Sequence, residues 1–431
     1  MSAAYPNGQP VPPPETNGAS AARDDLLYNL LYGAAIGQLG LSPASFQLLS
    51  RTVPWDWRAA SPDAVAAGQL DFCGLSPPWS AVADPAAGGR FDKAYGDFLA
   101  SILMVTKDSA LREEIRRATR LVRSASIAFD LAWAEARAAW KRAVGEADAP
   151  GFSVWLGAPA GFAANSELTA ATKDWNHALA VLAFLANEQT TPLLAAPLNA
   201  FAHATPRPNP HYARPFDAVA APAAPLYRVA RDSSSWLRAQ ENGGAAAALR
   251  FGLGAPAFDY ARTWAHVALP VQTSFFADYE KGRRREIASL REASALEVVI
   301  AFSAWGRIDA APAEWYRGYA TRFHQHGPFN KGFAGRPDGV GGVAAFGRGG
   351  YMAVRKTGLV VAHRPKITIA TDPETFAQTR ERWLGATALA IGPFRFDAAA
   401  GDRIAARDGA LVVESAATTP VIFGATVETL P

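Results

Sequence analysis

Two histidines in the segment FHQHGPFNKGF have the spacing most suggestive of chemistry in this chain. His324 and His326 are two residues apart, and on a β-strand such residues point to one face, where both imidazoles can ligate one metal ion. A third ligand would have to come from Asp309, His363 or a residue elsewhere. Because such His pairs are common by chance, both histidines are candidates only, and we expect no metal and no cofactor.

Other reactive residues lack the partners that catalysis needs. Cys73 is the single cysteine and has no neighbouring base in the sequence, so it is interpreted as a buried, inert thiol. Asp174 and His177 are three apart on an expected helix and are interpreted as a surface hydrogen-bonding pair. The glycine-rich segment 339–350 lacks the strand, helix and lysine of a phosphate-binding loop. No catalytic residue is predicted, although an enzyme site assembled from scattered C-terminal residues stays open.

Composition and charge exclude some classes of protein. The chain has 431 residues, of which 49% are hydrophobic and 19% charged, which is typical of a globular protein with a large core. A net charge of +3 is too small for a protein whose main partner is nucleic acid. The first residues have neither the basic nor the apolar part of a signal peptide. We therefore expect synthesis in the cytoplasm, with a leaderless release route still open.

The strongest pattern is a sustained heptad repeat in the first half of the chain. After a tail at 1–23 and short helical segments, one of them expected at SPASFQLLS, apolar or small residues alternate at spacings of four and three from Leu111 to Ala143. Asp108 is the expected N-cap of this helix. A second arm with the same alternation is expected over 166–189, with Ser166 as its N-cap.

Two such arms joined by one loop predict an antiparallel helical hairpin within a helical domain at 24–201. With arms at about 108–144 and 166–189, the expected register places Phe129 opposite Leu182 and Ala136 opposite Trp175. The connecting segment 145–165 is the hairpin tip. It is unusually apolar for a loop, and its large apolar residues are the candidate membrane- or partner-contacting group: Phe152, Val154, Trp155, Leu156 and Phe162.

The second half of the chain changes to the short, β-branched segments of strands. After a proline-rich connector at 202–225, residues 226–431 are expected to form a β-rich α+β domain, mainly antiparallel and sandwich-like. Gly358 is expected in a tight turn, and the segment ADYEKGRRREIASLREAS is expected to be a helix. A short helix with Asp372 as N-cap and Gly385 after its end is also predicted. The fold class is therefore α+β.

Three functional hypotheses follow. The first is a membrane-engaging, pore-forming or toxin-like protein that uses the hairpin tip against lipid and the β-rich part for recognition. In layout alone the chain resembles the α-helical pore-forming toxins, and this resemblance implies no residue role. The second is an assembly protein whose tip docks into a partner or a sister subunit, so that a homo-oligomer is possible. The third is the enzyme with an unrecognised site. The tip itself has an alternative role, packing back on its own chain. Burial of Phe152, Trp155 and Leu156 within the chain would remove the best support for the membrane hypothesis.

Overall fold

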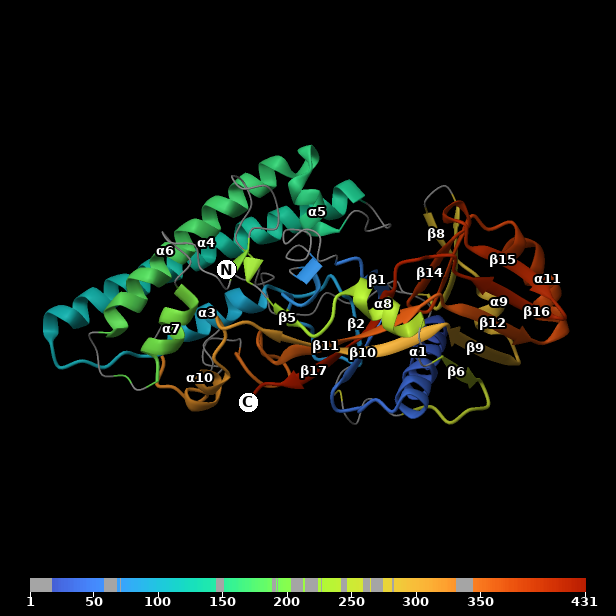
Figure 1. Cartoon of the computed structure of the whole chain (residues 1–431), viewed down its shortest axis with the longest axis horizontal. Coiled ribbons are helices and arrows are strands. Elements are labelled where there is room, and N and C mark those ends of the chain that lie inside the picture. The colour runs from blue at the N-terminus through green and yellow to red at the C-terminus, as the bar shows by residue number, and fades with distance from the viewer. Residues whose placement is uncertain are drawn as a thin grey trace.

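The chain is elongated, with a helical hairpin at one end and β-sheets at the other (Figure 1). The computed structural model describes residues 18–57, 68–69, 71–144, 151–187, 191, 193–202, 212–213, 224–225, 227–241, 246–258, 264, 274–280, 283–330 and 344–431. The expected tail up to residue 17, the first part of the tip at 145–150 and most of the connector at 202–225 lie outside these residues. Long helices and antiparallel sheets together make this an α+β protein.

Helices are concentrated in the first half of the chain. Their bounds are α1 (Gly18–Leu39), α3 (Phe91–Ser101), α4 (Ser109–Val144), α5 (Phe152–Gly157), η2 (Pro159–Gly161), α6 (Phe162–Asn187), α7 (Ala195–Ala202), α8 (Ser233–Glu241), α9 (Ala288–Glu292), α10 (Gly318–Phe323), α11 (Pro373–Leu384) and η4 (Ala398–Ala400). α1 begins at Gly18, inside the segment expected as a tail, because the alanine-rich residues at its start favour helix.

Among the described residues the largest sheet has the order β2-β1-β17-β11-β10-β5, a second has the order β15-β16-β12-β9-β6, and a third has the order β14-β13-β7-β8. The strand bounds are β1 (Phe46–Pro54), β2 (Val82–Ala83), β3 (Tyr212–Ala213), β4 (Ala224–Pro225), β5 (Tyr227–Val229), β6 (Ala247–Gly252), β7 (Phe276–Glu280), β8 (Arg283–Glu286), β9 (Leu296–Phe302), β10 (Ala304–Pro312), β11 (Val354–His363), β12 (Lys366–Thr371), β13 (Ala388–Ile391), β14 (Phe394–Asp397), β15 (Arg403–Arg407), β16 (Ala410–Glu414) and β17 (Val421–Thr429). The three sheets meet where Phe302 packs against Phe394 and Phe423, with ring centroids 5.9 and 5.4 Å away.

The segment SPASFQLLS is a strand and not the helix expected from its Ser-Pro start. It forms β1, which pairs antiparallel with the C-terminal strand β17 and parallel with β2. Its residues Phe46, Leu48 and Leu49 are buried. Sheet pairing with a distant strand thus overrides the local helix-start signal. The core of the largest sheet is therefore shared between the two ends of the chain.

Two further expectations in the β-rich part are wrong. Gly358 lies inside β11 and not in a turn, at an irregularity in the pairing with β17. A Cβ at this position would lie 2.6 Å from the hydroxyl oxygen of Thr426 and 2.7 Å from the carbonyl oxygen of Ile308, so glycine permits the close approach of both neighbouring strands. The segment expected as one helix from residue 277 instead contains β7, β8 and the short α9.

The helical hairpin is confirmed, but its register differs from the expected one. Asp108 caps α4 as predicted, since its carboxylate accepts hydrogen bonds from the amides of Ala110 and Leu111. α6 begins at Phe162 and not after Ser166, so the second arm starts one helical turn earlier. Phe129 consequently packs on Trp175, with ring centroids 5.6 Å apart, and not opposite Leu182.

The hairpin lies on α3 and α7, which connect it to the sheets (Figure 1). α3 approaches α6 and α7 closely at Gly96, where a Cβ would lie 2.6 Å from the rings of both Trp175 and Phe201. Tyr95 of α3 packs edge-on against both Phe201 and Trp315. The half of the hairpin nearest to α3 therefore belongs to the main hydrophobic core of the protein.

Candidate functional site: the hairpin tip

The tip is a short helix, α5, followed by the single turn η2 (Figure 1). Phe152, Trp155 and Leu156 have the i, i+3, i+4 spacing of one helical face, and all three are buried within the chain. Val154 and Phe162 point the other way and are 54% and 63% exposed. The alternative in which the tip packs back on its own chain is therefore confirmed for Phe152, Trp155 and Leu156, and the membrane hypothesis loses its expected support from these three residues. Val154 and Phe162 are the accessible apolar residues of the tip.

The buried tip residues belong to a hydrophobic cluster separate from the main core. We call it the distal cluster, and its buried members are Leu75, Phe129, Trp133, Ala136, Trp140, Phe152, Trp155, Leu156 and Leu168. Phe152 lies at its centre, with its ring 5.1 Å from that of Trp133 and 5.9 Å from that of Trp140, both edge-on. Most of these residues come from α4, α5 and α6, so the far half of the hairpin closes largely on itself.

The distal cluster meets the main core at Phe129, whose ring packs on Trp175 and lies beneath the guanidinium of Arg90. Further contacts come from the segments near residues 75 and 86. Among the described residues, Leu75 is its one buried member from outside the hairpin, and Ala86 packs against the cluster. Arg137 of α4 donates a hydrogen bond to the carbonyl oxygen of Ala86, while its guanidinium lies over the rings of Trp140 and Phe152, 4.7 and 4.9 Å from their centroids. The tip is therefore held by a small apolar contact and by polar groups.

The main polar contact is between Asp71 and Ser153, which we call the tip clasp. The Ser153 amide donates to both carboxylate oxygens of Asp71, at 3.1 and 3.0 Å, and its hydroxyl donates to Oδ1 at 2.5 Å. Burial raises the pKa of Asp71 to about 6, against the opposing effects of the Ser153 hydrogen bonds and the positive charge of Arg137. The clasp therefore ties α5 to the segment next to Cys73, and its charge state changes near neutral pH.

A second polar group fixes the middle of the hairpin. The Lys93 ammonium of α3 lies 2.5 Å from Asp97 and 2.9 Å from Asp130 of α4, and it donates a hydrogen bond to the Ser126 hydroxyl at 2.7 Å. The Trp175 indole N–H of α6 donates to Asp97. Burial raises the pKa of Asp130, and the carboxylates raise the pKa of Lys93 against its own burial. This network joins α3 to both arms of the hairpin.

One polar atom in the tip has no partner among the described residues. The Trp155 indole N–H is buried and donates no hydrogen bond there. Tryptophan in a protein interior usually finds an acceptor, and leaving a buried donor unpaired costs roughly 1–3 kcal/mol. The closed tip thus buries its apolar surface but leaves the polar end of one of its largest side chains unsatisfied.

The chemical candidates from the sequence do not assemble into a site. His324 and His326 lie in the turn after α10 and not on a strand. His324 is buried and His326 exposed, so the shared face expected of them does not exist. Within the described residues no group of three or more His, Cys, Asp or Glu could hold a metal ion. Cys73 is buried, and burial raises the pKa of its thiol to about 12.

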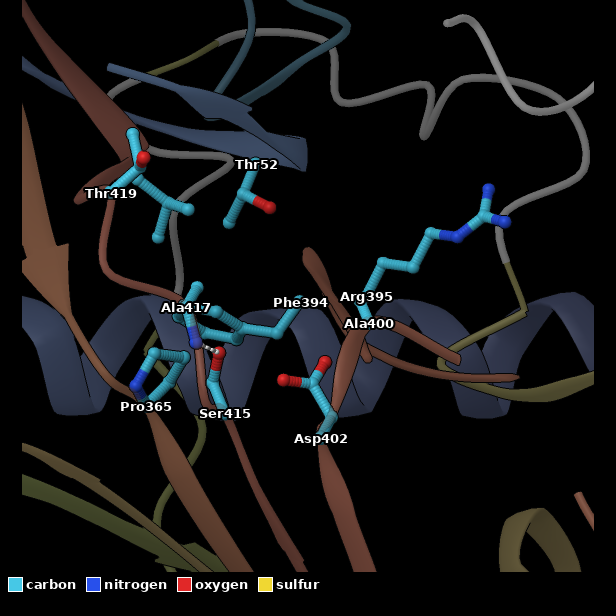
Figure 2. Close-up of a pocket in the computed structure, with 10 residues that line it drawn as sticks. Thr52, Pro365, Phe394, Arg395, Ala400, Asp402, Ser415, Ala417 and Thr419 are labelled. Carbon is cyan, nitrogen blue, oxygen red and sulfur yellow. Dashed lines mark hydrogen bonds between the residues drawn. The ribbon is translucent and has the colours of Figure 1, made fainter. Parts of the chain in front are cut away.

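A shallow crevice of about 120 Å³ lies near the junction of the sheets, lined by Thr52, Asp402, Ser415 and Thr419 among others (Figure 2). Both carboxylate oxygens of Asp402 already accept backbone hydrogen bonds, from Asp397 and Ala416. These two bonds fix the Asp402 carboxylate at the wall of the crevice. The segment 339–343 of the glycine-rich stretch lies outside the described residues.

Comparison with protein-family models, with curated proteins and with solved structures finds no match for this chain. In the part of the chain that the structure describes, none of the helices combines the length and apolar character needed to cross a membrane. The burial of Phe152, Trp155 and Leu156 could not be read from the polarity of the segment alone. Their helical spacing was the available signal for α5, and sequence reasoning missed it by treating the whole tip as a loop.

Proposed function

We propose that this is a membrane-engaging protein whose hairpin tip is stored in a closed form and opens at a lipid surface. The observation that carries the proposal is the distal cluster, which encloses Phe152, Trp155 and Leu156 separately from the main core. Pore formation and a toxin-like role are the finer form of the proposal. The β-rich part would then serve as a scaffold or recognition unit.

The energetics favour a tip that stays closed in water. Exposing three large apolar side chains costs roughly 5–9 kcal/mol, at about 1.5–3 kcal/mol each. Since about 1.4 kcal/mol corresponds to a factor of ten, fewer than about one molecule in a thousand would be open in solution. A lipid interface offsets this cost, because it receives the apolar side chains and supplies acceptors for the Trp155 indole N–H.

Val154 and Phe162 provide the test, because they are exposed already and their substitution leaves the buried packing intact. We expect Val154→Asp/Phe162→Asp to reduce dye release from vesicles at least tenfold with little change in melting temperature. Leu384→Asp, an exposed apolar residue of α11 at the other end of the molecule, is the matched control. If wild-type protein neither binds vesicles nor releases their dye at any pH from 5 to 9, with or without anionic lipid, the membrane proposal fails.

The second candidate is docking of the tip into a protein partner or a sister subunit. The exposure of Val154 and Phe162 favours it as well, since a few apolar anchors supply most of the energy of an interface. Light scattering separates the two candidates. A concentration-dependent oligomer that the Asp substitutions abolish, without vesicle binding, supports docking over lipid engagement.

A further inference from the structure

The outward face of α4 combines positive charge with exposed apolar residues. α4 contains eight Arg and Lys against four Asp and Glu, so this one helix has a net charge of +4 in a chain of +3. Arg116, Arg117, Arg120 and Arg123 are all exposed and lie within about two helical turns. Glu113 pairs with Arg116 and Arg120 at 3.7 and 3.4 Å, and these exposed pairs compensate only part of the charge.

Two leucines stand exposed along the same helix. Leu121 is 47% and Leu131 49% exposed, although the inward face of α4 is mainly apolar. Leu131 lies on the side of α4 opposite to its buried positions, and Leu121 lies at the edge of the buried side, between Ala118 and Ala125. Arginine around exposed large apolar side chains is the composition of a helix that lies on an anionic lipid surface.

We propose that this face of α4, which we call the basic face (Arg116, Arg117, Arg120, Arg123, Leu121 and Leu131), docks on the headgroups of an anionic membrane. The proposal rests on the membrane-engaging function and names its lipid partner. A nucleic acid would need the arginines but not the leucines, since phosphate contacts are electrostatic. An anionic membrane can bind both kinds of residue, because the arginines pair with the headgroups and the leucines enter the boundary between headgroups and acyl chains.

Docking on the basic face would occur with the hairpin still closed. α4 and α6 lie side by side at one end of the molecule (Figure 1). The four arginines and Leu121 lie in the half of α4 remote from α5, and Leu131 lies just past the middle of the helix. No residue of the basic face belongs to the distal cluster. Attachment and tip opening are therefore separate steps, which separate variants can block.

The test measures co-sedimentation with vesicles of phosphatidylcholine alone and of phosphatidylcholine with phosphatidylglycerol. Each basic residue near an anionic surface contributes about 1 kcal/mol, or about fivefold in affinity. We expect Arg117→Glu/Arg123→Glu to weaken binding to the anionic vesicles more than tenfold. The control Arg403→Glu/Arg407→Glu makes the same charge change on exposed residues of β15 at the opposite end of the molecule, and it should change binding less than threefold.

Leu121→Ser/Leu131→Ser should leave the response to salt unchanged but weaken binding to the anionic vesicles severalfold. Equal losses in the α4 and β15 charge variants would overturn the proposal, because binding would then follow net charge. It is also overturned if the leucine variant binds like wild type and RNA binds the basic face as tightly as the vesicles do. Circular dichroism and melting temperature verify that each variant is folded.

A hairpin closed by a disulfide separates this inference from the proposed function. The variant Asp71→Cys/Ser153→Cys, made with Cys73→Ser, joins two short side chains that are in direct contact. We expect the oxidised form to bind anionic vesicles like the Cys73→Ser parent and to release no dye. Loss of binding in the oxidised form contradicts docking through α4. If the protein binds vesicles through α4 but releases no dye even after reduction, docking on the basic face is supported and the opening of the tip is rejected.

Discussion

The hydroxyl of Ser153 donates a hydrogen bond of 2.5 Å to the carboxylate of Asp71, 82 residues away in the chain. This bond joins the tip of a long helical hairpin to the segment beside the buried Cys73. Together with the hydrogen bond from Arg137 to Ala86, it holds a small aromatic cluster closed. The behaviour of the hairpin therefore depends on a few polar contacts, and the first prediction concerns their response to pH.

Asp71 should make the closed tip most stable in acid. Burial raises its pKa to about 6 from an ordinary value near 3.8. The closed form therefore binds the proton more tightly than an open form in water. The resulting stabilisation is complete below about pH 4 and is lost as the pH rises through about 6. Because the residue is partly exposed, the effect should be about 1–3 kcal/mol, no larger than a pKa difference of about two allows.

Asp71→Asn tests this sign directly. The amide oxygen can still accept from Ser153, but no charge is buried at high pH. We expect the variant to be more stable than wild type at pH 8 and to have no such advantage at pH 4, measured by urea unfolding at both values. Ser153→Ala, which removes only the hydroxyl, should destabilise the tip at both values. If Asp71→Asn is less stable than wild type at pH 8, the negative charge of Asp71 does not destabilise the closed tip and the predicted sign is wrong.

The distal cluster should open independently of the sheets. Phe152→Ala removes the central ring of the cluster and should cost about 3–5 kcal/mol locally. Hydrogen exchange should then accelerate in α5 and in the adjoining parts of α4 and α6, with little change in β11 and β17. The matched variant Phe423→Ala, at the junction of the sheets, should accelerate exchange globally. Uniform acceleration by Phe152→Ala would show that the hairpin tip is not a separate unit.

Lys93 should be essential for keeping α3 against the hairpin. Lys93→Met leaves the carboxylates of Asp97 and Asp130 together without their cation, and breaking such a buried group typically costs about 3–5 kcal/mol. Lowering the pH should recover part of this loss, because Asp130, whose pKa is already raised by burial, then takes up a proton. Thermal unfolding at pH 5 and pH 8 measures both effects. If Lys93→Met lowers the melting temperature equally at pH 5 and pH 8, repulsion between the carboxylates of Asp97 and Asp130 is not the cause of the loss.

Gly358 should be irreplaceable by alanine. The added Cβ would meet the backbone of Ile308 and the side chain of Thr426 in the middle of the largest sheet, and overpacking of this kind costs about 1–3 kcal/mol. Gly254→Ala is the control, because nothing lies within 4 Å of the corresponding Cβ. The melting temperature of Gly358→Ala should fall by several degrees, and that of Gly254→Ala should not. Equal melting temperatures would show that the strands can move apart at no cost.

The hairpin arms were predictable, and the contacts that close the hairpin were not. Heptad spacing is local, so it revealed α4, and the Asp108 cap marked where the helix begins. The register failed because α5 and η2 fill part of the expected loop, which moves the start of α6 to Phe162. The tip clasp joins residues 82 positions apart, and neither Asp71 nor Ser153 has a local pattern that indicates the other.

β12, between β9 and β16, was predictable as a strand because its β-branched residues carry a local signal. β1 was missed because its partner β17 lies at the other end of the sequence and its own start resembles that of a helix. Similarly, β8 was missed because its run of arginines has the composition of a solvated helix, while its pairing with β7 decides its conformation.

The most direct test of the stored-tip account is dye release from anionic vesicles by Asp71→Cys/Ser153→Cys in the Cys73→Ser background, before and after reduction. The account predicts no release from the oxidised protein and recovery to the level of the Cys73→Ser parent once the disulfide is reduced. Release by the oxidised protein at the parent's rate would contradict the account, because the tip would then not need to leave Asp71.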